Sequence, residues 1–360
     1  MAYGTVNADV IGTSVAGSNL GAGNASIIKN RIINGAMVID QRNAGASGTA
    51  GGYTVDRWYY ASSQASKGTW QQNAGAVTPP VGFVNYLGFT SSSAYSVASG
   101  DYFAIGQPVE GFNIADLGWG TANAKTITLS FWVRSSLTGT FGGALQNSGA
   151  SRCYPFSYSI PVANTWTSIS ITIAGDTSGT WLTTNGTGVT VNFSLGYGTT
   201  YSGTAGAWSA NNYGSATGAT SVVGTSGATF YITGVQLEVG SSATGYEYRQ
   251  YQQELALCQR YYYQTVSPNS NSYVMTMCSN GTSRVRGTIP LPVPFRANST
   301  LSVISSGGFY QYTGGAISYT SVNTYSQYSS NNNALIDINI SGTSLGQYDW
   351  AAVLGFSAEL

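Results

Sequence analysis

Apolar side chains recur at every second position along short segments of this chain. The clearest alternations fall in residues 126–133, 166–173, 189–195 and 230–237. Successive side chains of a β-strand point to opposite faces, so each segment predicts a strand with one buried face. Stretches rich in Gly, Ser, Thr and Asn separate the segments and supply turns. The pattern predicts an antiparallel β-sandwich or jelly roll, and an all-β fold class.

The regions on either side of these strands divide the chain further. Residues 1–30 are small, polar and nearly uncharged. They cannot bury a core alone, which leaves a disordered tail or an arm that becomes ordered against a partner. We favour an attachment arm, followed by a jelly roll over residues 31–245. Residues 246–264 form a linker helix, and strand patterns in residues 265–360 predict a smaller C-terminal β-sandwich.

The linker is the one segment with a clear helical period. Its apolar residues Tyr251, Leu255, Cys258 and Tyr262 are spaced i, i+4, i+7 and i+11, which predicts a single apolar stripe. A helix of about three turns is marginal alone, so the stripe must be packed. Two arrangements stay open: the helix packs on its own sandwich, or copies of it meet at a threefold axis.

Charge is scarce and balanced. Only 7% of the 360 residues are charged, and 13 basic residues match 13 acidic ones. We therefore expect no basic surface for nucleic acid. No apolar run of about eighteen residues or signal-peptide pattern occurs, so we expect no membrane insertion. The surface must be solubilised by hydroxyl and amide groups, which also suit contact with sugar hydroxyls.

The densest group of charges lies between residues 29 and 60. It comprises Arg31, Asp40, Arg42, Asp56 and Arg57. Charges in a chain with so few of them tend to be buried and paired. We predict a structural ion-pair cluster that fixes the start of the sandwich.

The chain lacks the residues that most catalytic mechanisms need. It has no histidine, which excludes Ser-His-Asp, Cys-His and His-metal chemistry. A carboxylate pair of the glycosidase type is the remaining option. Its candidates are Asp40, Asp56, Asp101, Glu110, Asp116 and Asp176. We expect no catalytic residues and no enzymatic activity.

Cofactor and metal sites are not expected either. Three cysteines lie far apart, without the spacing of a zinc site or a disulfide framework. No dense run of Asp and Asn predicts a calcium loop, so we assign no metal ligand and no cofactor.

Aromatic residues are the positive sign of binding. One group lies in the long loop from Gly196 to Thr229, and another lies in the C-terminal sandwich. Tyrosine among Ser, Gly and Asn gives a large contact area at low entropic cost. The alternative is packing within a core or across strands. The carbohydrate-binding candidates are Tyr197, Tyr201, Trp208, Tyr213, Tyr310, Tyr312, Tyr325 and Tyr328.

Three stretches carry a resemblance to a known family. They are RIINGAMVIDQRNAG with YTVDRWYY, TLSFWVRSSLTGTF, and FYITGVQLEVGSSATGYEYRQYQQELALCQRYYYQ. Together they resemble the carbohydrate-binding-module-like jelly roll of tailed-bacteriophage tail fibres and related virion proteins. A structural Ca²⁺ is common in the resembled domains, and no residue here is assigned to it.

The resemblance implies a role and its partners. It implies a structural protein of the virion: a homotrimeric tail fibre that binds host cell-surface glycan and attaches to other virion proteins through residues 1–30. A capsid decoration or head-fibre protein without receptor binding is the first alternative. A polysaccharide depolymerase is the second.

Overall fold

The computed structural model describes residues 28–265, 275–279, 284–313, 316–320, 322–329, 333–340 and 347–360. The chain divides into two compact units, Met1–Arg249 and Gln250–Leu360, and each is described by itself. Most of the expected attachment arm, residues 1–27, lies outside the described residues. None of the helices described is long and apolar enough to cross a bilayer.

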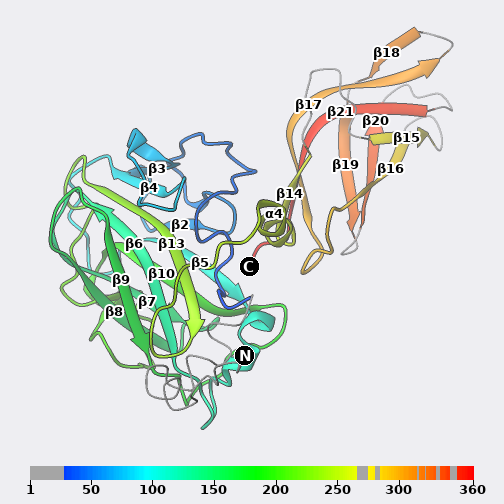
Figure 1. Cartoon of the computed structure of the whole chain (residues 1–360). Coiled ribbons are helices and arrows are strands. Elements are labelled where there is room, and N and C mark those ends of the chain that lie inside the picture. Colours follow the sequence, from blue (N-terminus) through cyan, green and yellow to red (C-terminus); the bar gives the residue numbers. More distant parts are fainter. Residues whose placement is uncertain are drawn as a thin grey trace, which may run out of the picture. The chain divides into compact units, whose positions relative to one another are not determined.

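The first unit is a sandwich of two antiparallel sheets (Figure 1). One sheet has the strand order β1-β2-β5-β10-β7-β8, and the other has the order β3-β4-β13-β6-β9. The short strands β11 and β12 pair separately and in parallel. The strands are β1 (Gly52–Tyr53), β2 (Tyr59–Ser62), β3 (Gly68–Gln72), β4 (Leu87–Ser91), β5 (Tyr102–Glu110), β6 (Ile127–Ser135), β7 (Gly139–Gln146), β8 (Cys153–Ile160), β9 (Thr167–Ile173), β10 (Thr187–Tyr197), β11 (Ser202–Gly203), β12 (Ser215–Ala216) and β13 (Thr229–Val239). Four 3-10 turns are η1 (Ala74–Ala76), η2 (Gly111–Asn113), η3 (Ala115–Leu117) and η4 (Thr199–Tyr201).

The alternating residues of the central strands form the core between the sheets. Leu129, Phe131 and Val133 of β6 are buried against the ring of Phe193 and its neighbours on β10. The residues between them on β6, Ser130 and Trp132, lie on the opposite face and are only partly buried, as period-two segments require. The all-β sandwich expected from the alternation is therefore confirmed.

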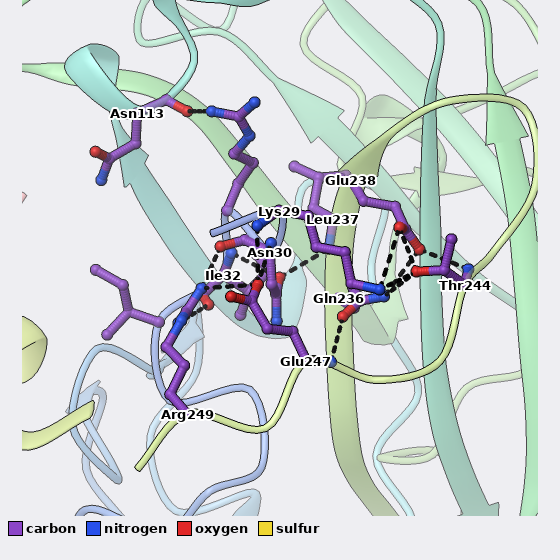
Figure 2. A network of polar contacts seen from close by, with 12 residues as sticks. Lys29, Asn30, Ile32, Asn113, Gln236, Leu237, Glu238, Thr244, Glu247 and Arg249 are labelled. Atoms are coloured by element: carbon purple, nitrogen blue, oxygen red, sulfur yellow. Dashed lines mark hydrogen bonds and ion pairs between the residues drawn. The ribbon is translucent and has the colours of Figure 1, made fainter. Parts of the chain in front are cut away.

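A network of polar groups ties the first described residues to β13 and to the segment that follows it (Figure 2). We call this network the clamp. Its members are Lys29, Asn30, Gln236, Glu238, Thr244, Glu247 and Arg249. Glu238 and Gln236 are almost fully buried, so their hydrogen bonds are made away from water.

A bulge in β13 makes room for the clamp. The register of β13 against β6 shifts between Thr233 and Gln236, and Gly234 there has φ +63. A side chain on Gly234 would also collide with the ring of Phe83. The bulge frees the backbone of Val235, whose carbonyl accepts a hydrogen bond from Asn30 Nδ2 at 3.1 Å.

Two residues of the clamp link the segment that leads into the sandwich to the segment that follows its last strand. Arg249 donates to the carbonyl of Ile32 at 3.1 Å and to that of Asn30. Glu247 Oε2 accepts the backbone N–H groups of Lys29 and Asn30 at 3.0 and 2.7 Å. The two ends of the sandwich are thus fixed at neighbouring points.

The charges between residues 29 and 60 do not share one cluster. Arg42 and Asp56 form the expected ion pair, at 3.9 Å. Arg31 instead pairs with Asp116 at 2.8 Å, because its side chain reaches η3 rather than the other four residues. The expectation of a single cluster is therefore corrected to separate contacts.

The other two members of the expected cluster bind backbone groups. Asp40 accepts the N–H groups of Asn43 and Gly45 at 3.1 and 2.7 Å, because the turn after it leaves those donors free. Arg57 is fully buried and donates to the carbonyl of Pro108 at 2.6 Å. These charges hold the loop and the neighbouring strand in place.

The second unit begins with a helix and continues as an antiparallel sheet. Its strand order is β18-β17-β21-β15-β16-β20-β19, and β14 also pairs with β21. A small separate core includes Val285, Ile336, Leu354 and Phe356. The elements are α4 (Tyr251–Gln259), β14 (Tyr262–Gln264), β15 (Met275–Ser279), β16 (Arg284–Pro290), β17 (Thr300–Thr313), β18 (Ala316–Thr320), β19 (Val322–Ser329), β20 (Asn333–Ile340) and β21 (Gln347–Ser357).

The helix is shorter than expected and buries a different face. It ends at Gln259, because the next residues turn into β14, which pairs with β21. Tyr251 is 59% exposed, whereas Glu254 and Cys258 are buried. The prediction of a single apolar stripe is therefore wrong, because Tyr251, Leu255, Cys258 and Tyr262 do not form one buried face.

Candidate functional site

A cleft of about 340 Å³ opens on the outer face of the six-stranded sheet. This face lies opposite the core, so its side chains are free to meet solvent or a ligand. The cleft is lined by Tyr102, Gln146, Tyr197, Tyr201, Asn212 and Gly214. Strands β5, β7 and β10 supply three of these residues, and the long excursion after β10 supplies the rest.

Three tyrosines form the aromatic part of the lining. Tyr102 and Tyr197 are direct cross-strand partners on β5 and β10, with ring centroids 6.4 Å apart. Tyr201, in η4, meets Tyr102 edge-on at 6.0 Å. The hydroxyl groups of these three residues have no hydrogen-bond partner in the described part of the chain. The rings thus offer both apolar faces and unused polar atoms.

A chain of hydrogen bonds crosses the same face and reaches the cleft. The hydroxyl of Tyr59 donates to Asn192 Oδ1, and Asn192 Nδ2 donates to Gln146 Oε1 at 2.7 Å. Gln146 Nε2 then donates to Asn212 Oδ1 at 2.8 Å and to the carbonyl of Tyr213 at 3.1 Å. We call this chain the amide relay. It fixes the orientation of each amide and leaves Asn212 Nδ2 as a donor at the cleft.

A glycine makes the relay sterically feasible. Gly106 of β5 lies between Tyr59 and Asn192 in the sheet register. A Cβ at this position would lie 2.5 Å from Asn192 Oδ1 and 2.6 Å from the hydroxyl of Tyr59. Only glycine lets the two side chains meet above the strand.

The buried carboxylate of Asp101 fixes the start of β5 next to the cleft. Asp101 accepts hydrogen bonds from the hydroxyls of Tyr95 and Ser63 at 2.7 and 2.8 Å. Its backbone carbonyl accepts the N–H of Gly198 at 2.9 Å, beside Tyr197. The hydrogen bond from Tyr95, followed by that from the Ala98 N–H, holds the pKa of Asp101 well below its usual range. Asp101 therefore stays ionised and positions the neighbouring Tyr102.

Two tyrosines of this face, Tyr197 and Tyr59, stay neutral at ordinary pH. Burial, and then the neighbouring Tyr102, raise the pKa of Tyr197 above its usual value. Burial raises the pKa of Tyr59 in the same direction, with smaller effects from Tyr197 and Tyr53. The lining holds no Asp, Glu, Lys or Arg. The cleft can therefore stack on an apolar ring face and exchange neutral hydrogen bonds.

The structure brings together three of the residues predicted for carbohydrate binding. Tyr197 and Tyr201 line the cleft, and Tyr213 is joined to the relay through its carbonyl. Trp208 lies elsewhere: its indole N–H donates to the carbonyl of Ala174 at 2.7 Å. Tyr310, Tyr312, Tyr325 and Tyr328 lie on β17 and β19, and their side chains lie outside the described residues.

Trp208 belongs to a packed tryptophan cluster. Its ring centroid lies 5.3 Å from that of Trp119 and 5.4 Å from that of Trp181. Both partners are buried, and Tyr154 covers a further edge. Packing of this kind was the alternative explanation for the aromatic groups.

Sequence reasoning missed six members of the cleft and the relay, of which Asn212 and Gly214 lie in the long excursion after β10. Tyr59, Tyr102, Gln146 and Asn192 come from four separate strands, and nothing local in the sequence joins them. Tyr102 and Asn192 offered a signal, because each lies in a segment, residues 102–109 or 189–195, whose alternate residues enter the core.

Four of the six carboxylates considered for catalysis are held by separate partners. Asp176 pairs with Arg152 at 2.6 Å, and Asp116 pairs with Arg31. Asp40 and Asp101 accept hydrogen bonds from their own loops. Within the described residues, no three His, Cys, Asp or Glu side chains lie together in a way that could hold a metal ion.

Comparisons with known proteins give structural similarity only. No protein-family model matches the chain, and no curated protein matches it. The chain is similar to the enzymatically active domain of bacteriophage CBA120 tailspike protein 4, with 12% identity and a TM-score of 0.33. This match covers 60% of the chain and 22% of that protein, so the chain spans about a fifth of its length.

Two bacterial sugar-binding proteins are similar over their whole length. A putative sugar binding protein from Bacteroides thetaiotaomicron has 12% identity and a TM-score of 0.34, over 59% of this chain and 100% of that one. The family 11 carbohydrate-binding module of a Clostridium thermocellum cellulase has 13% identity and a TM-score of 0.27, over 56% and 99%.

Proposed function

We propose that this chain binds a glycan of the host cell surface in the cleft of the six-stranded sheet, without cleaving it, as a component of a tailed-phage particle. The observation that carries the proposal is the lining of the cleft. Tyr102, Tyr197 and Tyr201 place ring faces and unpartnered hydroxyls around one opening, and Asn212 adds an amide. A sugar ring presents C–H faces and hydroxyl groups, which match such a lining.

The relay supports this use of the site because it orients the cleft before a ligand arrives. Asn192 and Gln146 are held from both sides, so little side-chain freedom is lost when a ligand binds. A preorganised set of neutral groups suits recognition. It does not supply the acid and nucleophile of a glycosidase, which would have to be carboxylates.

The placement on a phage particle rests on the three resembling stretches. In the structure these stretches contribute to the clamp and to the two sheets, which is an architectural role. Attachment through residues 1–30 and the homotrimer remain predictions from the resemblance.

The test is binding of the purified chain to host cells and to extracted surface polysaccharide, with released reducing sugar assayed in the same sample. We expect binding without release. Tyr102→Ala should weaken binding about tenfold or more, roughly 1.4 kcal/mol. Tyr102 is 36% exposed, so the fold should survive the change. Phe112→Ala is the matched control, because Phe112 is 58% exposed and lies outside the cleft lining.

Each other outcome would point to a different role. Release of sugar would support the depolymerase. A folded chain that binds no host glycan would support the capsid decoration or head-fibre protein. Equal loss of binding in Tyr102→Ala and Phe112→Ala would place the site outside the cleft.

A further inference from the structure

Strand β9 is an edge of the five-stranded sheet, and its outer side has no partner. It pairs only with β6, through an unbroken register from Thr167↔Val133 to Ile173↔Ile127. Among the described residues, no other backbone or side-chain group bonds to the backbone of β9. In an antiparallel pair, alternate residues direct their N–H and C=O groups away from the partner strand, so every second residue of β9 leaves a backbone donor and an acceptor on its outer side.

The neighbouring edge shows how this sandwich protects a strand. Strand β8 lies beside β9 and ends the six-stranded sheet (Figure 1). Cys153 exchanges two backbone hydrogen bonds with Ser209, at 3.0 and 2.8 Å, and Pro155 accepts another from Gly206. Among the described residues no segment covers strand β9, and the strand itself contains no proline, bulge or charged residue. These are the usual means of blocking edge pairing.

The sequence of β9 is complementary to itself in an antiparallel pair. With a twofold axis at Ser170, Ile169 of one copy faces Ile171 of the other, and Ser168 faces Thr172. Over residues 168–172 like side chains therefore meet on both faces, apolar with apolar and hydroxyl with hydroxyl, whereas Thr167 faces Ile173 at the two ends. Residues 168, 170 and 172 are exposed, and although the hydroxyl of Thr172 donates to the carbonyl of Ser241 at 2.9 Å, its oxygen can still accept from a partner.

The inward face gives the contact its driving force. Ile169 and Ile171 pack on the edge of the core but remain only half-buried. A second β9 would cover them and extend the core across both copies, in addition to forming the ladder of backbone hydrogen bonds.

We propose that β9 pairs antiparallel with β9 of a second copy of this chain, which joins the two five-stranded sheets into one. The contact is isologous, so it closes at two copies. It therefore gives a dimer rather than the homotrimer expected from the resemblance. A dimer would also carry two clefts, which raises avidity for a surface with repeated ligands.

The first test is the mass of the full chain in solution, by light scattering after size exclusion, with Ser170→Lys beside wild type. We expect a dimer for wild type. In Ser170→Lys two lysines meet at the twofold axis, and repulsion should weaken the dimer at least tenfold. Ser148→Lys is the control, because Ser148 is exposed in the turn between β7 and β8, is not part of β9, and should leave the dimer intact.

The second test checks the register in which the two β9 strands pair. In a Cys278→Ser background, which removes the exposed cysteine, Ser170→Cys should form an intermolecular disulfide under mild oxidation. The same background with Ser148→Cys should not. A wild-type monomer would overturn the proposal, as would a trimer or dimer that Ser170→Lys leaves unchanged.

Discussion

The clamp and the cleft are both polar regions of the sandwich, but they use polar groups in opposite ways. The clamp holds charged side chains that are buried and bound to other parts of the chain: Glu247 binds two backbone N–H groups and Arg249 binds two carbonyls. The cleft has no charged lining residue, and the hydroxyls of Tyr102 and Tyr201 have no partner among the described residues. In this chain the charged side chains of the clamp stabilise the fold, whereas neutral aromatic and amide groups line the candidate binding surface.

The two kinds of aromatic surface repeat the contrast. On the outer face of the five-stranded sheet, Tyr86 and Tyr231 are buried beneath the segment that contains η1. The hydroxyl of Tyr86 donates to the carbonyl of Ala74 at 2.6 Å, and the indole of Trp166 donates to that of Thr78 at 2.9 Å. An aromatic residue whose polar atom is bound within the chain contributes to packing, whereas Tyr102 combines partial exposure with an unused hydroxyl and can recognise a ligand.

The largest effect should follow a change in the clamp. Arg249→Ala removes a buried guanidinium, leaving the carbonyls of Asn30 and Ile32 without this donor and Glu247 without its cation at 3.7 Å. We expect a loss of about 3–5 kcal/mol in the free energy of unfolding, the usual result of breaking a buried pair. Urea denaturation would measure it. Glycan binding of the folded fraction should not change.

The control for this prediction is a cation at the surface. Lys125→Ala removes a side chain that is 51% exposed and lies 3.9 Å from Asp116. Exposed pairs contribute about 0–1 kcal/mol, so unfolding should hardly move. Equal effects of the two changes, or loss of glycan binding in folded Arg249→Ala, would contradict the separation of clamp and cleft.

How far the sequence predicts this molecule depends on whether the relevant contacts are local. Alternation in residues 126–133 and 189–195 was enough to predict the strands and the sandwich, because period-two burial is a local property. The pairing of Arg31 with Asp116 was missed, because the residues are 85 positions apart. For the same reason the cleft was found only in part: Tyr197 and Tyr201 lie close in sequence, but Tyr102 and Gln146 reach them through strand pairing.

A change in the amide relay should have an intermediate effect, and it would show whether the relay serves ligand binding as well as stability. Gln146→Leu removes the acceptor of Asn192 and the donor that holds Asn212. We expect about tenfold weaker glycan binding by calorimetry, and a loss of roughly 1–2 kcal/mol in stability because Asn192 loses its partner.

A glutamine outside the relay separates the two effects. Gln71 donates to the carbonyl of Gly45 at 2.8 Å from the other sheet, so Gln71→Leu should lower stability by a similar amount and leave binding intact. If both substitutions weakened binding equally, the relay would not be what orients the cleft.

The smallest effect should be that of pH. The pKa of Tyr197 and of Tyr59 lies above the usual value near 10, so both hydroxyls stay protonated below that pH. The pKa of Asp101 is lowered, so its contribution to stability is complete above its unfolded value near 4 and is lost only as pH falls through the lower folded value. Between about pH 5 and 9 the hydroxyls of Tyr197 and Tyr59 and this supporting carboxylate keep their charge states. We therefore expect the Kd for glycan, measured by calorimetry across about pH 5 to 9, to vary less than about twofold. A steep change within that range would mean that a titrating group takes part in binding, and the distinction between a charged clamp and a neutral cleft would fail.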